Sequence, residues 1–243
     1  MLRSRLEKLF QDQLHGGTDG PAPDFTQPPG EPALSPPDSV SWIVFGNPVS
    51  LFIGGITAVL LELAEPKVRS GVWDHTTFRT DPLKRMRRTG LAAMITVYGA
   101  RSVAERMIAG VRRMHDRVQG FTPGGTPYQA NDPDLLRWVH ATAAFGFLEA
   151  YHAYVRPVSS VDRDRFYAEG APVSQLYGAE SAPASEEELR VLFSEMQPRL
   201  EVGAGMARAL PQRADRLGPD HVVDLTGYGR IADSALTAER AIE

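Results

Sequence analysis

Apolar residues recur at helical spacing along most of this 243-residue chain, and no segment shows the sustained alternation typical of strands. The most apolar stretch runs from Trp42 to Ala64, but Gly46-Asn47-Pro48 interrupts it. The remaining run, 51–64, has the length of one core helix and is too short to span a bilayer. Glu65-Pro66 ends it, because a proline cannot continue a helix that began before it. We therefore expect a buried helix here and no stable membrane span.

Start and stop signals divide the rest of the chain into further helices. Asp132-Pro133 pairs a natural N-cap with a proline at the first helical position, and Ser185 with Glu188 forms a capping box. The residues that follow them repeat at helical spacing. These patterns predict helices over 82–98, 102–118, 133–155, 161–170 and 185–198, a further helical piece over 199–210, and a turn of helix within 67–80. The predicted fold class is all-α, a single helical domain.

The ends of the chain differ from this helical body. Residues 1–14 have the spacing of a short amphipathic helix, and residues 15–39 hold seven prolines and four glycines. Such a segment is typical of a flexible lead-in or of an extended arm over the surface. We predict a flexible arm over 1–40, a helical catalytic domain over 41–210 and a weakly patterned tail over 211–243.

The composition excludes several classes of functional site but does not by itself indicate one. The net charge is -4, which gives no electrostatic reason to expect nucleic acid as a partner. There are no cysteines, so thiolate nucleophiles, cysteine-bound zinc, iron–sulfur clusters and covalently attached haem are excluded. The first residues lack the apolar run of a secretory signal, and we expect a cytoplasmic protein. The oligomeric state is left open.

Four histidines fall in the predicted helical body, and two of them have apolar neighbours. His115 lies late in its helix and shares a face with Val111 and Ile108, so it can present a nitrogen to a metal or simply favour the helix C-terminus. His140 lies in an apolar segment, where a buried imidazole needs a hydrogen bond or a metal. It is either a satisfied core histidine or part of a site.

The other two histidines are weaker candidates. His75 follows Asp74 in a short segment and is either a surface histidine or one whose tautomer a carboxylate fixes. Glu149 and His152 form a Glu-x-x-His element that suits a di-metal site, but such a site needs a second copy and the chain has none.

Several motifs, taken together and in order, resemble one enzyme family, that of the latex-clearing protein and the mycophenolic-acid-pathway oxygenase MpaB. They are Asp74-His75-x-x-Phe78, Asp81-Pro82-Leu83-x-Arg85-x-x-x-Thr89, His115-x-x-Val118-x-Gly120, Tyr128-x-Ala130-Asn131-Asp132-Pro133 and Trp138-Val139-His140-Ala141-Thr142. The resemblance covers roughly residues 42–200. It implies an all-helical fold around a non-covalent haem b, which reacts with dioxygen and a small apolar, unsaturated or natural-product substrate.

The resemblance also implies roles for individual residues. His115 matches the family's axial histidine and is the expected metal ligand, and Arg85 and Thr89 match an Arg-x-x-x-Thr pair beside the haem. Arg88 stands where latex-clearing proteins have a lysine that caps iron; an arginine stays protonated, so the distal side is open or Arg88 holds a propionate. His140 matches a second pocket histidine, and His75 matches an early histidine without an assigned role. The expected catalytic residues are Arg85, Thr89 and His140.

Two departures from the family pattern keep other functions open. Glu65 stands before Pro66 where family members have histidine, and residues 212–243 do not continue the family's helical pattern. The first hypothesis is a haem b oxygenase. The alternatives are a helical binding protein that keeps the fold without turnover, and an enzyme that uses its histidines for acid–base chemistry without a metal.

Overall fold

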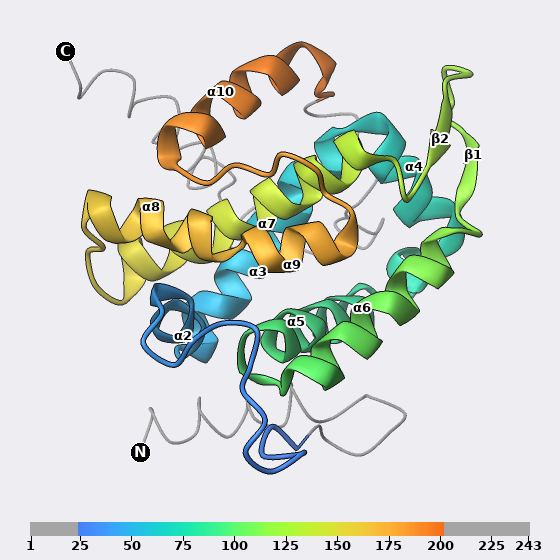
Figure 1. Ribbon diagram of the computed structural model, residues 1–243. Helices are drawn as coiled ribbons and strands as arrows, with labels where there is room; N and C mark the ends of the chain where they lie inside the picture. Colours follow the sequence, from blue (N-terminus) through green and yellow to red (C-terminus); the bar gives the residue numbers. More distant parts are fainter. Residues whose placement is uncertain (1–23, 202–243) are drawn as a thin grey trace, which may run out of the picture. The chain divides into compact units, whose positions relative to one another are not determined.

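The computed structural model describes residues 24–201, and within them helices dominate (Figure 1). In chain order the elements are α2 (Val40–Phe45), α3 (Pro48–Ala64), α4 (Pro66–His75), the 3-10 helix η1 (Thr77–Arg79), α5 (Pro82–Tyr98), α6 (Arg101–His115), β1 (Gln119–Phe121), β2 (Pro127–Gln129), α7 (Pro133–Tyr154), α8 (Ser160–Glu169), α9 (Ala171–Tyr177), α10 (Glu186–Met196) and the 3-10 helix η2 (Gln197–Arg199). The predicted all-α class is confirmed. The predicted helix over 1–14, most of the piece over 199–210 and the tail over 211–243 lie outside the described residues.

Side-chain caps open the helices where local sequence predicts them. Asp132 accepts a hydrogen bond from the backbone N–H of Asp134 at 2.9 Å and begins α7, with Pro133 at its first position. Ser185 accepts from the N–H of Glu188 at 3.2 Å and begins α10. Each cap satisfies a backbone donor that the first helical turn leaves without a partner. The predicted starts of these two helices are confirmed.

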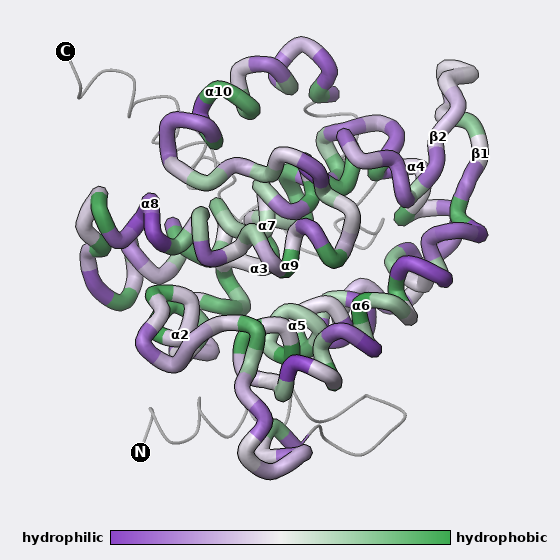
Figure 2. The backbone as a smooth tube through the Cα atoms, in the orientation of Figure 1, coloured by the Kyte–Doolittle hydropathy of each residue, from purple (hydrophilic) through white to green (hydrophobic). Residues whose placement is uncertain are grey.

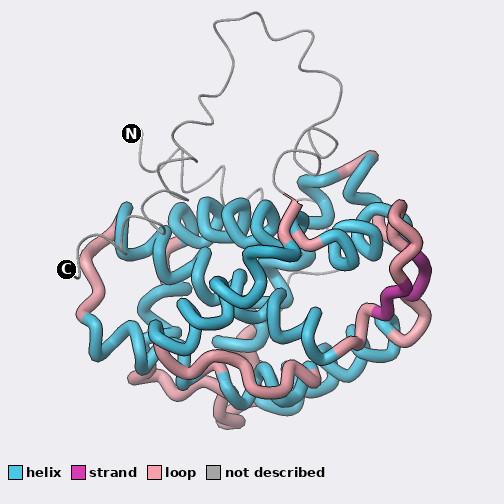
Figure 3. The backbone as a smooth tube through the Cα atoms, turned by 90° about the horizontal axis from the view of Figure 1, so that it is seen from above, coloured by secondary structure: helices cyan, strands magenta, loops and turns pink. Residues whose placement is uncertain are grey.

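Several parts of the described chain differ from the expected elements. Residues 66–75 form the whole of α4, because the Glu65 carboxylate accepts from the N–H of Val68 at 2.8 Å and so begins a helix where α3 ends. Helices α2 and α9 were not predicted. The helix expected over 102–118 ends at His115, since 119–121 pair antiparallel with 127–129 in a small hairpin (Figure 3).

Helices α3 and α7 form the closest-packed pair and carry much of the core. Trp138 and Leu148 on α7 are fully buried, and the rings of Phe45 and Phe147 lie 4.9 Å apart. Figure 2 shows hydrophobic residues along both helices, whereas α6 is hydrophilic over much of its exposed length. The largely apolar pattern of 51–64 thus reflects a helix buried by the rest of the domain.

Residues 24–39 contact the helical body at defined positions, although they fall within the arm expected to be flexible. Leu34 is 8% exposed and packs with Ala104 and Ile108 of α6. The Glu31 carboxylate accepts hydrogen bonds from the Ser102 backbone N–H at 2.6 Å and the Ser102 hydroxyl at 2.9 Å. This part of the arm is therefore packed against α6, a result that a Pro-rich composition does not reveal.

Within residues 24–201, no single helix has the length and apolar character needed to cross a bilayer. Helices α3 and α4 meet those criteria only when taken together, and they are bent by 108° where they join.

Candidate functional site

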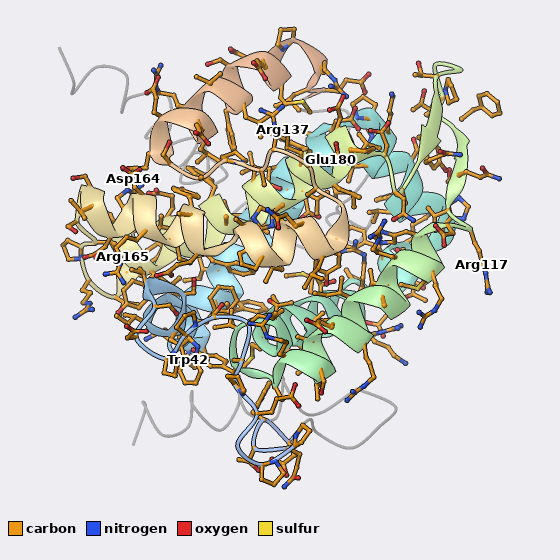
Figure 4. The ribbon with its side chains drawn as sticks, viewed as in Figure 1. Trp42, Arg117, Arg137, Asp164, Arg165 and Glu180 are labelled. Atoms are coloured by element: carbon orange, nitrogen blue, oxygen red, sulfur yellow. The ribbon has the colours of Figure 1, made fainter. Side chains whose placement is uncertain are left out.

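His115 occupies the last position of α6, just before the chain turns toward β1. Figure 4 labels Arg117, two residues further on, at this corner. The Nδ1 atom of His115 is buried and has no hydrogen bond of standard geometry. Burial lowers the pKa of His115, and the nearby Arg85 charge lowers it further, while a hydrogen-bond contact with Asn131 and the Asp116 charge raise it. The net shift is downward, so the ring is neutral at pH 7 and its nitrogens can act as ligands.

Arg85 on α5 is a buried cation whose charge lowers the pKa of this histidine. Its Nη1 atom is buried without a hydrogen-bond partner, and its guanidinium carbon lies 5.8 Å from the centre of the Phe78 ring. Burial lowers the pKa of Arg85 and the Glu62 carboxylate raises it, but the group remains charged at neutral pH. The fold thus places one neutral imidazole and one desolvated cation within electrostatic reach of each other.

Glu62 on α3 belongs to the same group of side chains, although sequence reasoning did not single it out. It is 7% exposed, and burial raises its pKa to about 7, while Arg85 acts to lower it. The carboxyl group can therefore hold or release a proton near neutral pH. The available signal was a lone acid within the apolar run 51–64, a position where a carboxyl group must be paired or protonated.

The Arg-x-x-x-Thr pair does not act as one unit. The Thr89 hydroxyl donates to the backbone carbonyl of Arg85 at 3.1 Å, within the same helix, and its side chain is exposed. Arg88 is exposed as well. Of the three α5 residues expected at the site, Arg85 alone is directed into the buried environment that includes His115.

His140 lies on α7 and packs against the junction of α8 and α9. A Cβ at Gly170 would lie 3.0 Å from its Nε2 atom, so the backbone of that junction fits closely around the ring. Burial lowers the pKa of His140 to about 4. The imidazole is neutral at pH 7, and the groups that shift the pKa of His115 do not include it.

His75 is exposed and holds the hairpin against α4. Its Nε2 lies 3.2 Å from the Tyr128 hydroxyl, which donates to Asp74 at 3.4 Å. Tyr128 is 5% exposed and faces Gly120 across the hairpin, where a Cβ would lie 2.8 Å from its hydroxyl oxygen. Asp74 therefore contacts the tyrosine, and the structure brings His75 to Tyr128, not to His115.

The Glu-x-x-His element is occupied by structural contacts. Glu149 forms an ion pair with Arg163 of α8. The Nδ1 of His152 accepts a hydrogen bond from the Val158 backbone N–H at 3.0 Å, which fixes the turn after α7. Among residues 24–201, no group of three or more His, Cys, Asp or Glu side chains is placed to hold a metal ion.

Comparison with known proteins identifies the family. The model of the family described as "ER-bound oxygenase mpaB/B'/Rubber oxygenase, catalytic domain" matches residues 42–237. The chain belongs to the MpaB/rubber oxygenase family. Membership confirms the resemblance read from the motifs, and it supports an oxygenase-type enzyme. The match reaches beyond the expected residues 42–200, so the expected departure of the tail over 212–243 from the family is not borne out.

Curated relatives match a much smaller part of the chain. A 7-cyano-7-deazaguanine synthase of Maricaulis maris is 61% identical over 49 residues, and one of Caulobacter vibrioides is 55% identical over 49 residues. In each case the match covers 20% of this chain and 20% of the relative, so the chain spans about a fifth of their length. No solved structure matches. The MpaB/rubber oxygenase match, with its far greater coverage, carries the functional argument.

A neutral imidazole and one orphaned guanidinium nitrogen of this MpaB/rubber oxygenase domain fit the haem that the resemblance implies. A haem takes one or two protein ligands to its iron, so a cluster of three ligands is not needed. The neutral ring of His115 offers such a ligand, and the unpartnered Nη1 of Arg85 offers a donor for a propionate. Two surface pockets, of about 340 Å³ between α2 and α8 and about 300 Å³ beside α6 and α9, are lined by neither residue.

Proposed function

We propose that this chain is a haem b-dependent oxygenase that acts with dioxygen on an apolar, unsaturated substrate. One observation carries the proposal: His115, whose ring is neutral, lies within electrostatic reach of Arg85, a buried arginine whose Nη1 atom has no hydrogen-bond partner. A buried polar atom without a partner costs about 1–3 kcal/mol. Such an atom beside a neutral imidazole is expected where a bound group completes its contacts.

Each residue then has a distinct task. His115 would hold the iron through one ring nitrogen, and Arg85 would neutralise a propionate with the N–H of its unpartnered Nη1 atom. When bound, haem b supplies the iron centre at which dioxygen reacts. Glu62, whose pKa of about 7 allows both protonation states, holds or releases a proton beside Arg85. His140 stabilises the packing of α7 against the junction of α8 and α9, and the exposed Arg88 and Thr89 lie outside the buried group around His115.

The substrate class rests on the family description and on the character of α5. Rubber, named in that description, is an apolar and unsaturated polymer. Leu91, Met94 and Ile95 of α5 are only partly buried by the rest of the chain, which leaves apolar surface on a helix that carries Arg85. Such a surface favours an apolar ligand over a charged one.

The visible spectrum of the purified protein tests the cofactor. The full-length protein, as isolated or after addition of hemin, is expected to show a Soret band that shifts on reduction. His115→Ala is expected to abolish or displace this band, whereas His75→Ala, an exposed control, leaves it unchanged. No Soret band after hemin addition, or an unchanged band in His115→Ala, overturns the proposal.

Oxygen uptake with a panel of unsaturated apolar compounds tests turnover. Uptake that requires both the haem and a substrate supports the oxygenase. Haem binding without uptake on any member of the panel favours the alternative of a helical binding protein that keeps the family fold.

A further inference from the structure

The Asn131 side chain connects the loop before α7 to the end of α6. Its Nδ2 atom donates to the backbone carbonyl of Arg112 at 3.0 Å and to the Asp116 carboxylate at 2.6 Å. An amide nitrogen has two N–H groups, and both acceptors lie at the end of α6. The two hydrogen bonds therefore fix the orientation of the amide, and with it the position of its oxygen.

The Asn131 amide lies beside His115. Its acceptors belong to Arg112 and Asp116, on either side of that residue in the sequence, and Asn131 raises the pKa of the His115 ring. The Oδ1 of Asn131 and the Nδ1 of His115 are both buried, and neither has a hydrogen-bond partner within the usual limits of distance and angle. An amide oxygen can only accept, and a neutral imidazole carries its proton on one of its two nitrogens. The two orphaned atoms are complementary if that proton is on Nδ1.

We propose that Asn131 is a positioning residue that accepts a hydrogen bond from Nδ1–H of His115 and so leaves Nε2 as the nitrogen that binds iron. The inference rests on the proposed function, since it assigns the tautomer of the proposed ligand. A hydrogen bond to the far nitrogen of a ligating histidine fixes the ring orientation and makes the ligand more basic. The Arg112 and Asp116 contacts hold the acceptor in place.

A purely structural role for Asn131 makes a different prediction. If the amide only satisfies the Arg112 carbonyl at the end of α6, the essential atom is Nδ2 and the oxygen is irrelevant. Asn131→Asp would then be the most harmful change, because it replaces the donor with an oxygen beside the Asp116 carboxylate. Asn131→Leu, which keeps the size of the side chain, would be the milder change. A role through His115 reverses that order.

The experiment compares hemin binding and the ferrous iron–histidine stretching frequency in the full-length protein and three variants. Asn131→Leu is expected to weaken hemin binding about 10- to 100-fold and to lower the frequency, because the ligand loses its acceptor. Asn131→Asp is expected to bind hemin more tightly than Asn131→Leu and to raise the frequency, because a carboxylate is a stronger acceptor. Gln129→Leu, at an exposed amide on β2, serves as the control and leaves both quantities unchanged.

The outcomes separate this inference from the proposed function. If the unchanged protein binds hemin through His115 but Asn131→Leu and Asn131→Asp leave the frequency unaltered, or shift it in the same direction, the role of Asn131 is refuted and the haem proposal stands. If the unchanged protein does not bind hemin, both fail. Asn131→Leu removes the acceptor and Asn131→Asp strengthens it, so the two variants are expected to shift the iron–histidine frequency in opposite directions. If only one variant folds, the direction of its frequency shift still tests the inference.

Discussion

Gly54 of α3 and Gly146 of α7 meet backbone to backbone: a Cβ at Gly54 would lie 2.5 Å from the carbonyl oxygen of Gly146. Because both residues lack a side chain, the two central helices approach more closely than any larger residue allows. This contact fixes the crossing of α3, which carries Glu62, with α7, which carries His140.

Gly54→Ala is expected to destabilise the protein by about 1–3 kcal/mol, the usual cost of overpacking a tightly packed core. Gly55→Ala is the matched control in the same helix, since its Cβ would meet nothing nearer than the Phe147 ring at 3.8 Å. Alanine also has the higher helix propensity, so the control should be neutral or slightly stabilising. Urea unfolding measures the stability of both variants. Equal free energies of unfolding for Gly54→Ala and Gly55→Ala would contradict the close crossing of α3 with α7.

Glu62→Gln is expected to change how stability depends on pH. Burial raises the pKa of Glu62 from near 4.5 to about 7, so between these values the folded protein holds a proton that the unfolded chain releases. This contribution is fully present below pH 4.5 and is lost as the pH rises through 7. The glutamine variant should match the unchanged protein at low pH and be more stable above pH 7, by about 1 kcal/mol or more, since one pKa unit corresponds to ~1.4 kcal/mol.

Urea unfolding at a series of pH values checks this expectation for Glu62. Glu105→Gln, on the exposed face of α6, is the control and should follow the unchanged protein throughout. A Glu62→Gln variant that is less stable than the unchanged protein above pH 7 would contradict the raised pKa, because it would show that the folded protein favours the carboxylate over the protonated form.

The sequence was most informative where structure depends on neighbouring residues. Asp132-Pro133 and the pair Ser185 and Glu188 mark helix starts through contacts within one turn, and both starts are where local patterns predict them. The hairpin was not predicted, because strands of three residues carry no periodic pattern. It is held by the packing of Tyr128 against Gly120 and α4, a contact that no local rule contains.

Some residues of the candidate site were likewise expected from the sequence, and others were found only in the structure. The proximity of Arg85 and His115 follows the order of the family motifs, so it was expected before the structure. Glu62 and Asn131 were not proposed for the site, because their environment depends on α5 and on the end of α6, to which they are not adjacent in sequence. His75 was expected at the site through its motif alone, and its contact with Tyr128 places it with the hairpin.

Substitution of His140 is expected to make the free energy of unfolding depend less on pH between about pH 4 and 6.5. Burial lowers the pKa of His140 from 6.5 to about 4, so between these values the unfolded chain binds a proton that the folded protein does not. The stabilisation is present above pH 6.5 and is lost as the pH falls toward 4. His140→Gln should reduce the slope of the unfolding free energy across this interval, whereas His75→Gln, at an exposed position, should leave it as it is. An unchanged slope in His140→Gln would refute the burial of a neutral ring.

The Glu31 carboxylate is expected to stabilise the start of α6 from outside the helix. Ala100, at the N-cap position of α6, provides no side-chain acceptor, and Glu31 accepts from the N–H and hydroxyl of Ser102 in its place. Glu31→Ala should cost about 1 kcal/mol, as the loss of an N-cap usually does. Asp38→Ala, an exposed acid of the same segment, should cost little. Thermal unfolding compares the two, and a Glu31→Ala midpoint equal to that of Asp38→Ala would show that residues 24–39 do not support α6.

The central claim is that His115 is the iron ligand of a haem b oxygenase, and chemical rescue tests it most directly. His115→Gly removes the imidazole and leaves space for a free one. The variant should lose the histidine-ligated Soret spectrum of the hemin-loaded protein, and added imidazole should restore it, while His75→Gly should keep the original spectrum without imidazole. A His115→Gly variant with the spectrum of the unchanged protein, before any imidazole is added, would contradict the claim.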